Sequence, residues 1–272
     1  MNNFFKLCLD AILEKNTATK CDLTNYIYNI VSTNINQLQF TPLTPIISTK
    51  NPGRPDKPEL ISPLKVPKRK PGTREGHAGL IHALAHIEFN AINLALDACY
   101  RFQNMPLEYY QDWMLVAKEE VYHFQLLEQH LINLGFNYGH FSAHNGLWDM
   151  AIRTEDDIIA RMALVPRTLE ARGLDAVPDM QKKLLTSNDT RAIEILNIIH
   201  HDEIKHVSIG NTWFQYLCNK EAINSEDKFF ELLKKYNAPK IRGAFNREDR
   251  IKAGFSNSEL DKLIQFSSEQ IL

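Results

Sequence analysis

The sequence has little cysteine, and the four cysteines that it contains are far apart. Cys8, Cys21, Cys99 and Cys218 form no Cys-x-x-Cys pair, which excludes zinc-finger spacing and the dithiol redox motif. A dense disulfide framework is typical of small secreted domains, whereas isolated thiols are typical of proteins in reducing compartments. We therefore expect four free, buried cysteines.

The chain also lacks targeting signals and a surplus of charge. Its first residues, MNNFFKLCLDAILEKN, have no basic region of the kind that opens a signal peptide. No apolar run is long enough to span a bilayer, and a formal net charge of −2 gives no general attraction to nucleic acid or membrane. We expect a cytoplasmic protein that does not associate with membranes.

Nucleotide-binding signatures are missing as well. The sequence contains neither a P-loop nor a Gly-x-Gly-x-x-Gly turn, and it has no internal repeat apart from the one described next. The function must therefore be inferred from other residues.

Two short stretches carry the pattern Glu-x-x-His: Glu120-Val-Tyr-His123 and Glu203-Ile-Lys-His206. Three residues are close to one helical turn, so in each stretch the carboxylate and the imidazole project from the same helix face. One such stretch is a weak signal, because Glu and His are common on solvated helix faces. Two of them in one chain can supply most of the ligands of a dinuclear metal site.

A single glutamate precedes each stretch by nearly the same distance. Glu88 lies 32 residues before Glu120, and Glu170 lies 33 residues before Glu203. Glu followed by Glu-x-x-His, occurring twice, is the ligand pattern of ferritin-like bundles that bind two iron or two manganese ions. The predicted metal ligands are Glu88, Glu120, His123, Glu170, Glu203 and His206.

The neighbours of these glutamates argue against the alternative, that they are charges on outer helix faces. The positions one to three turns away on the same face as Glu88, Glu120 and Glu203 are apolar or glycine: Ile81, Leu84, Ile92, Ala95, Trp113, Val116, Phe124, Leu127, Leu196, Ile199, Gly210 and Trp213. The carboxylates therefore belong to apolar stripes that should face a core. An ionised carboxylate is costly there unless it is paired or bound to metal.

The apolar period and the helix breaks predict an all-α, ferritin-like four-helix bundle. The four helices are expected near 77–103, 107–134, 154–172 and 190–218. The short link between the first two makes them antiparallel, and the irregular stretch 136–153 is the long crossover that such a bundle needs. Pro166 should kink the third helix one turn before Glu170, and Gly173 should end it. A short helix near 176–186 is expected before the fourth.

The rest of the chain is expected to decorate this bundle. We predict an N-terminal helix over 3–15, a second short helical or irregular piece near 25–30, and surface helices near 225–237 and 257–270. Residues 41–72 contain eight prolines, which exclude a regular helix. Their interleaved aliphatic residues favour an extended strap packed on the bundle over a free linker. The predicted domains are 1–76 (helix and strap), 77–218 (bundle) and 219–272 (C-terminal extension).

Several polar residues near the predicted ligands are candidates for a supporting role. His200 lies one turn before Glu203, Arg167 and Arg172 flank Glu170, and Tyr122 lies inside the first Glu-x-x-His. For both arginines, the simpler interpretation is solvated surface charge. For Tyr122, it is a structural role. His82 and His86 do not share the face of Glu88, so we expect them to be hydrogen-bonded structural histidines.

The chain resembles the ferritin-like family catalogued as domain of unknown function 455. The matching stretches run from the proline strap almost to the C-terminus: Pro52–Pro58, Leu84–Ile92, Glu120–His123, Val165–Gly173, His200–His206 and Phe245–Gly254. The resemblance implies a ferritin-like fold with a di-iron centre and no established substrate. All six predicted ligands match the family's motif, whereas the first forty residues match nothing we can name.

The predicted ligand set favours an O2-dependent oxidoreductase, oxidase or hydroxylase that acts on an unidentified small molecule. Four glutamates and two divalent ions make a neutral site, which suits a buried cavity, and oxygen-rich ligation suits iron first and manganese second. The alternatives are a ferroxidase that stores or detoxifies metal, a tRNA-modifying hydroxylase and a scaffold without turnover. Only the basic run Lys65, Lys68, Arg69, Lys70 and Arg74 points toward nucleic acid, and a solvated charged run is the better explanation of it. The electron donor and the oligomeric state are left open.

The pattern also assigns a role to each predicted ligand. Glu120 and Glu203 each share a helical turn with a histidine, so we expect them to bridge two metals roughly 3.5–4 Å apart. Glu88 and Glu170 would then be terminal ligands.

Overall fold

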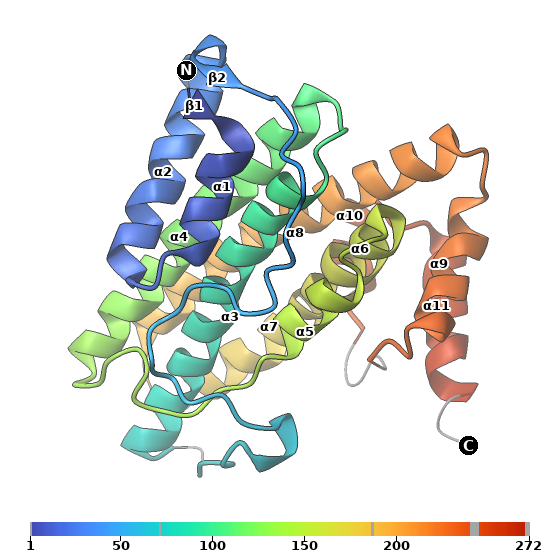
Figure 1. Ribbon diagram of the computed structural model, residues 1–272. Coiled ribbons are helices and arrows are strands. Elements are labelled where there is room, and N and C mark those ends of the chain that lie inside the picture. Colours follow the sequence, from blue (N-terminus) through green and yellow to red (C-terminus); the bar gives the residue numbers. More distant parts are fainter. Residues whose placement is uncertain (1, 71, 186–187, 240–244, 270–272) are drawn as a thin grey trace. The chain divides into compact units, whose positions relative to one another are not determined.

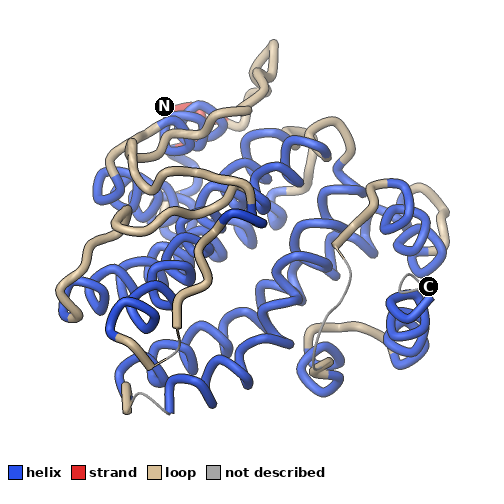
Figure 2. Tube along the Cα trace, turned by 90° about the horizontal axis from the view of Figure 1, so that it is seen from below, coloured by secondary structure: helices blue, strands red, loops and turns tan. Residues whose placement is uncertain are grey.

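The computed structural model describes residues 2–70, 72–185, 188–239 and 245–269. Over these residues the chain is mainly helical and has almost no strand, which confirms the all-α class (Figures 1 and 2). It forms two compact units: unit 1 comprises Met1–Ile152 and Asp189–Ile195, and unit 2 comprises Arg153–Asn188 and Leu196–Leu272. The three-part division at 76 and 218 stays a prediction.

Unit 1 is built on two long helices covered by two shorter ones. Its elements are β1 (Asn2–Asn3), α1 (Phe4–Leu13), α2 (Thr17–Thr33), a 3₁₀ turn (Ile35–Gln37), β2 (Leu38–Gln39), a second 3₁₀ turn (Pro63–Lys65), α3 (Arg74–Arg101), α4 (Leu107–Asn133) and α5 (Gly146–Arg153). Helix α1 packs on α3 and α2 packs on α4 (Figure 1). Helix α2 is longer than the short piece expected, because the Asn16 side chain caps it by accepting from the Thr19 N–H.

Helices α3 and α4 run antiparallel, as their short link predicts. The Tyr109 hydroxyl at the start of α4 donates to the Ala98 carbonyl near the end of α3, at 3.3 Å. At the opposite end, Arg74 of α3 donates to the Leu134 carbonyl just beyond α4, at 2.9 Å. The middle of one helix therefore faces the middle of the other.

The strap, residues 41–72, is attached to α3 by buried polar contacts. Thr49 is its main attachment point: its hydroxyl is 3.0 Å from an Asp97 carboxylate oxygen and accepts from Arg101 at 2.8 Å. The Thr49 carbonyl also accepts from the indole N–H of Trp148 in α5, at 3.0 Å. Over its described residues, the segment that these partners hold is mainly extended and includes the 3₁₀ turn Pro63–Lys65.

The crossover after α4 differs from the irregular stretch that was expected. Its second part forms the short helix α5, in which Trp148, Met150 and Ala151 are buried. Its first part is held against the strap, where the Ile61 and Ala143 N–H groups donate to the Ala143 and Glu59 carbonyls, both at 2.9 Å. An apolar face of about two turns explains the helix that the Gly- and Asn-rich sequence concealed.

Unit 2 contains the remaining helices. They are α6 (Ile158–Leu164), a π-helical segment (Val165–Glu170), α7 (Ala171–Leu185), α8 (Thr190–Lys220), α9 (Ser225–Lys235), α10 (Arg247–Lys252) and α11 (Asn257–Glu269). The first six residues of α8 belong to unit 1. Among the helices of the described residues, none has the length and apolar character needed to cross a membrane.

The prediction of one helix over 154–172 that ends at Gly173 was wrong. The helix starts at Ile158, changes to π geometry at Val165 and continues as α7 to Leu185. Gly173 lies inside α7 and does not have the positive φ of a helix-ending glycine. A buried ion pair between Asp175 and Arg250 of α10, 2.7 Å long, shows that tertiary contacts extend the helix past that point.

Candidate metal centre

Three of the predicted ligands come together inside unit 1. Glu88 projects from the middle of α3, and Glu120 and His123 project from the facing part of α4. The Nδ1 atom of His123 lies 3.2 Å from Glu88 Oε2 and 3.5 Å from Glu120 Oε2. We call Glu88, Glu120 and His123 the unit 1 group.

The unit 1 group is almost completely withdrawn from solvent. Glu120 and His123 are 0% exposed and Glu88 is 3% exposed. The apolar positions that the helical period placed around them are buried too, among them Ile92, Val116 and Phe124. The prediction that these carboxylates belong to a core-facing stripe is therefore confirmed.

In this buried setting, the negative charge of one glutamate makes ionisation of the other unfavourable. Burial, followed by the charge of Glu120, raises the pKa of Glu88 well above its ordinary value, while His123 acts in the opposite direction. One imidazole, even when protonated, carries a single positive charge and cannot balance two ionised carboxylates. A bound divalent cation would supply that balance and would favour the ionised form of both glutamates.

The other three predicted ligands belong to unit 2, and we call Glu170, Glu203 and His206 the unit 2 group. Glu203 and His206 share one face of α8, with Glu203 Oε1 3.9 Å from His206 Nδ1. His206 is 0% and Glu203 8% exposed. Within the described residues, the Oε2 atom of Glu203 is buried and has no hydrogen-bond partner. A buried carboxylate oxygen of this kind is suited to act as a metal ligand.

The π-helical segment ends at Glu170. Pro166 has no N–H to donate, and Thr168 uses its hydroxyl to donate to the Ala163 carbonyl five residues back, at 2.7 Å. Short π segments are frequent at functional sites, because the extra residue in the turn redirects the side chains that follow. The sequence indicated that Pro166 disturbs the helix near Glu170. In the structure this disturbance is the π-helical segment.

A close approach in unit 2 places α8 against this π segment. A Cβ atom added to Gly210 would lie 2.4 Å from Pro166 Cβ, nearer than real Cβ atoms approach one another. Gly210 is one helical turn beyond His206, so the contact places His206 in the part of α8 that packs on the segment bearing Glu170. The absence of a side chain at 210 is what permits this packing.

The residues considered for a supporting role have other partners. His200 Nε2 lies 2.9 Å from Asp249 of α10. Arg167 pairs with Glu259 of α11 and lies over the rings of Phe214, Phe229 and Phe255. Neither of these ion pairs includes a predicted ligand.

The other two supporting candidates are largely on the surface. Arg172 is exposed, and Tyr122 is 45% exposed. Surface charge is thus the interpretation that fits Arg172, and the Tyr122 ring faces outward from α4.

The two histidines near Glu88 are hydrogen-bonded to the crossover, as expected. His82 Nε2 accepts from the Gly139 N–H at 2.9 Å, and His86 Nδ1 is 2.8 Å from the Tyr138 hydroxyl. Burial, followed by the charge of neighbouring His86, lowers the pKa of His82 to about 4. Both histidines attach the crossover to α3 and therefore have a structural role.

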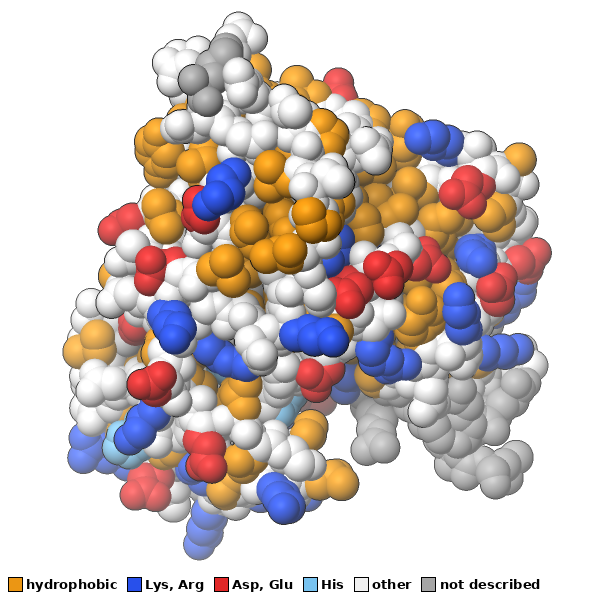
Figure 3. All heavy atoms as spheres, in the orientation of Figure 1, with side chains coloured by type: hydrophobic (Ala, Val, Ile, Leu, Met, Phe, Trp, Pro, Cys, Tyr) orange, Lys and Arg blue, Asp and Glu red, His pale blue; other side chains and the backbone are white. Residues whose placement is uncertain are grey.

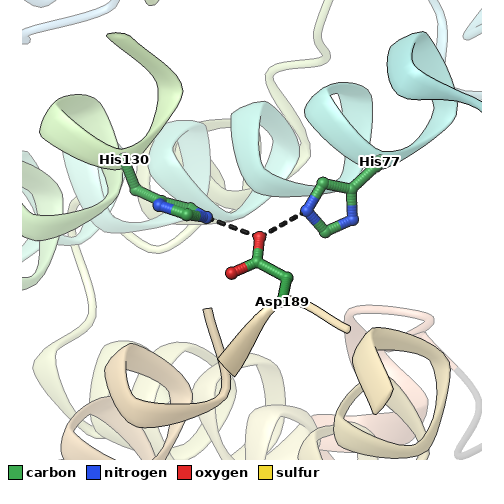
Figure 4. Close-up of side chains that lie close together, drawn as sticks. All are labelled: His77, His130 and Asp189. Atoms are coloured by element: carbon green, nitrogen blue, oxygen red, sulfur yellow. Dashed lines mark hydrogen bonds and ion pairs between the residues drawn. The ribbon is translucent and has the colours of Figure 1, made fainter. Parts of the chain in front are cut away.

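A second set of metal-ligand side chains, His77, His130 and Asp189, also comes together in unit 1 and was not anticipated (Figure 4). These residues are separated by 53 and 59 positions in the sequence, with no short motif to connect them. The only available signal was the helix-capping character of Asp189 before α8.

Comparison with known proteins places the chain in a family without assigning it an activity. The model of the family described as "Protein of unknown function (DUF455)" matches residues 13–261. An uncharacterized protein of Haemophilus influenzae is 44% identical over 269 residues, covering 96% of this chain and 93% of that protein. No solved structure matches the chain.

Proposed function

The chain belongs to the family of unknown function DUF455, and we propose that it is a di-metal oxidoreductase that uses O2 to oxidise a small organic substrate. The observation that carries the proposal is the unit 1 group. Two carboxylates and an imidazole, each at most 3% exposed, come together on facing helices, with His123 Nδ1 3.2 Å from Glu88 and 3.5 Å from Glu120. Such a group is costly to bury without a cation.

The donor set fits iron or manganese better than softer metals. Glutamate oxygens and imidazole nitrogens are the ligands of non-haem iron and manganese sites, whereas none of the three residues offers a thiolate. Following the sequence pattern, we propose that the unit 1 group and the unit 2 group together hold two ions. Two bound iron ions would supply the electrons and the O2 chemistry of the reaction.

The chain's own contribution is charge balance, positioning and exclusion of water. Four glutamates would neutralise two divalent ions, so the complete site would carry no net charge. The neighbouring aromatic and aliphatic side chains, such as Phe89 and Phe124 with ring centroids 5.4 Å apart, would keep bulk water from the reacting centre. Because Glu88 and His123 are on different helices, their ligation would also hold α3 and α4 in register.

The contacts of the basic run at 65–74 do not favour the tRNA alternative. Arg69 lies over the Phe141 ring at 4.1 Å, and Arg74 donates to Leu134 and lies over the Phe136 ring. On the face drawn in Figure 3, lysine and arginine side chains are interspersed with aspartate and glutamate and do not form a basic patch. A small-molecule substrate is therefore the choice that we carry forward.

The test of this proposal compares Glu120→Gln with Glu119→Gln in the full-length protein. Glu120→Gln removes one charge from the buried group, so at least one metal ion per chain should be lost. Glu119 is the neighbouring residue and points about 100° away on the helix, so its variant should keep the wild-type metal content. Elemental analysis of the purified variants measures this, and equal metal content in the two would overturn the assignment.

A second measurement tests the redox activity. Metal-free protein would be loaded anaerobically with ferrous iron and mixed with O2. O2 consumption that exceeds that of free iron, and that is lost in Glu120→Gln but not in Glu119→Gln, supports O2-dependent redox chemistry at the site, by an oxidase or by a ferroxidase. Metal binding without O2 consumption would instead favour the scaffold alternative.

A further inference from the structure

His77, His130 and Asp189 meet at one point of unit 1 from three different elements. His77 is in the first turn of α3, His130 is in the last turn of α4, and Asp189 directly precedes α8. Figure 4 shows the two imidazoles approaching the same carboxylate oxygen from opposite sides. The Nε2 atoms of His77 and His130 lie 2.5 Å and 2.6 Å from Asp189 Oδ2.

The two oxygens of Asp189 have different tasks. Oδ1 caps α8 by accepting from the Ala192 N–H at 2.8 Å. This bond fixes the carboxylate and directs Oδ2 toward the two imidazoles. A ligand carboxylate whose other oxygen is held by a backbone donor is the arrangement that orients metal ligands in proteins.

We propose that His77, His130 and Asp189 bind one divalent transition-metal ion of the zinc class, separately from the six predicted di-metal ligands. Two imidazole nitrogens and one carboxylate are the protein ligands of many zinc sites that keep a fourth position open. The ligand atoms of the three residues all lie within 4.8 Å of one another. The three side chains are buried or nearly so, with side-chain exposures of 13%, 8% and 10%.

Binding requires modest movements of the three side chains. Ligands about 2.0–2.1 Å from a tetrahedral ion are about 3.3 Å apart, so each nitrogen must move less than 1 Å away from Oδ2. The two nitrogens, which lie within 4.8 Å of each other, must approach each other by up to about 1.5 Å. An imidazole that binds the ion through Nε2 carries its proton on Nδ1. The ion then takes the place of two hydrogen-bond protons.

A neighbouring pocket provides space for the fourth ligand. This pocket, of about 170 Å³, is lined by His130 together with polar side chains that include Gln129, Asn133 and Arg191. It has room for water, which would complete a four-coordinate ion. The same pocket makes the site accessible to an ion from solution.

The alternative is that the three residues form a hydrogen-bonded clasp and nothing more. A clasp and a metal site predict different responses to a change of His130 to glutamine. A glutamine amide can still donate a hydrogen bond to Asp189, so it preserves the clasp, but it is a poor zinc ligand. Asp189→Asn similarly keeps the helix cap, because asparagine is as good at the N-cap as aspartate, and removes the charged ligand.

The experiment measures zinc binding to the metal-free full chain by equilibrium dialysis and elemental analysis. Zinc alone is the probe, and His140→Gln is the matched control because His140 is an exposed histidine of the same unit. We expect His130→Gln and Asp189→Asn each to lose one zinc equivalent, with affinity at that site reduced at least about 100-fold. His140→Gln should bind as the wild type does.

Zinc binding is compared only for variants that circular dichroism shows to be folded. One folded variant of the two is enough to decide the test. Wild-type stoichiometry and affinity in a folded His130→Gln or Asp189→Asn protein would overturn the proposal and leave the clasp. The Glu120→Gln chain separates this result from the di-metal proposal, because it should retain the zinc equivalent that His130→Gln loses. Failure of the di-metal site therefore does not remove this one.

Discussion

The unit 1 group and the unit 2 group have the same sequence pattern but are built on different supports. In unit 1, α3 and α4 are uninterrupted over 28 and 27 residues, and Glu88 lies in the middle of its helix. In unit 2, the corresponding glutamate, Glu170, is the last residue of a π segment between two α-helices. The same ligand spacing can thus be carried by a regular helix or by an irregular one, and the irregular one depends on particular tertiary contacts.

The largest effect is expected from breaking the buried ion pair between Asp175 and Arg250 in unit 2. We expect Asp175→Ala to destabilise the protein by about 3–5 kcal/mol, because it leaves the guanidinium of Arg250 buried without its partner. The exposed Asp179 of the same helix, whose pair with Lys182 is 3.3 Å long, is the control. Asp179→Ala should change the free energy of unfolding by about 0.5 kcal/mol or less.

Urea denaturation of both variants measures the difference. If Asp175→Ala is as stable as Asp179→Ala, then the pair does not extend α7 past Gly173, and the contrast between the units is weaker than described.

The contact between Gly210 and Pro166 gives the next largest effect. Gly210→Ala would place a methyl group 2.4 Å from Pro166 Cβ, so α8 and the π segment must move apart at a cost of about 1–3 kcal/mol. Gly173→Ala is the matched change, since a Cβ there meets no atom within 4 Å. That variant should gain about 0.5–1 kcal/mol from its higher helix propensity.

Thermal unfolding would show these shifts in opposite directions. Gly210→Ala should also weaken metal binding by the unit 2 group while the unit 1 group keeps its ion. A Gly210→Ala protein with normal stability would show that the close packing on the π segment is not required.

The smallest expected effect is a loss of stability at acidic pH, and it concerns His82 of unit 1. The folded pKa of His82, about 4, is below its ordinary value of 6.5, so the unfolded chain binds more protons between these values. The corresponding stability is complete above pH 6.5 and is lost as the pH falls toward 4. The lowered pKa of His82 comes first from burial of the ring and then from the charge of His86. The Gly139 N–H donates to Nε2, and a ring protonated at Nε2 could not accept this bond.

His82→Gln keeps an acceptor for Gly139 and cannot titrate. Its free energy of unfolding should therefore fall less steeply between pH 6.5 and 4 than that of the wild type. Parallel curves for the two proteins would contradict this role of His82.

The sequence predicts much of the fold because helical periodicity is a local property. The apolar residues that recur around Glu88 and Glu120 do face the core, and the short link before Leu107 does make α3 and α4 antiparallel. The four free, buried cysteines were predicted as well. In each case residues within a few turns contain the whole signal.

What the sequence does not reveal depends on distant partners. Gly173 looks like a helix end until the pair of Asp175 with Arg250, 75 residues later, is known. The cluster of His77, His130 and Asp189 has no motif, because its members come from two helix ends and a helix cap. Arg167 next to Glu170 suggested support for the ligand, but its partner Glu259 lies 92 residues away. Each of these required tertiary contacts that no local pattern encodes.

The most direct test of the central claim is anomalous diffraction at the iron edge, from crystals of the full chain loaded anaerobically with ferrous iron. We predict two iron peaks that are contacted by the unit 1 group and the unit 2 group, with His123 and His206 each bound to a different ion. The absence of an iron peak at Glu88, Glu120 and His123 would contradict the claim that these buried residues form a metal centre.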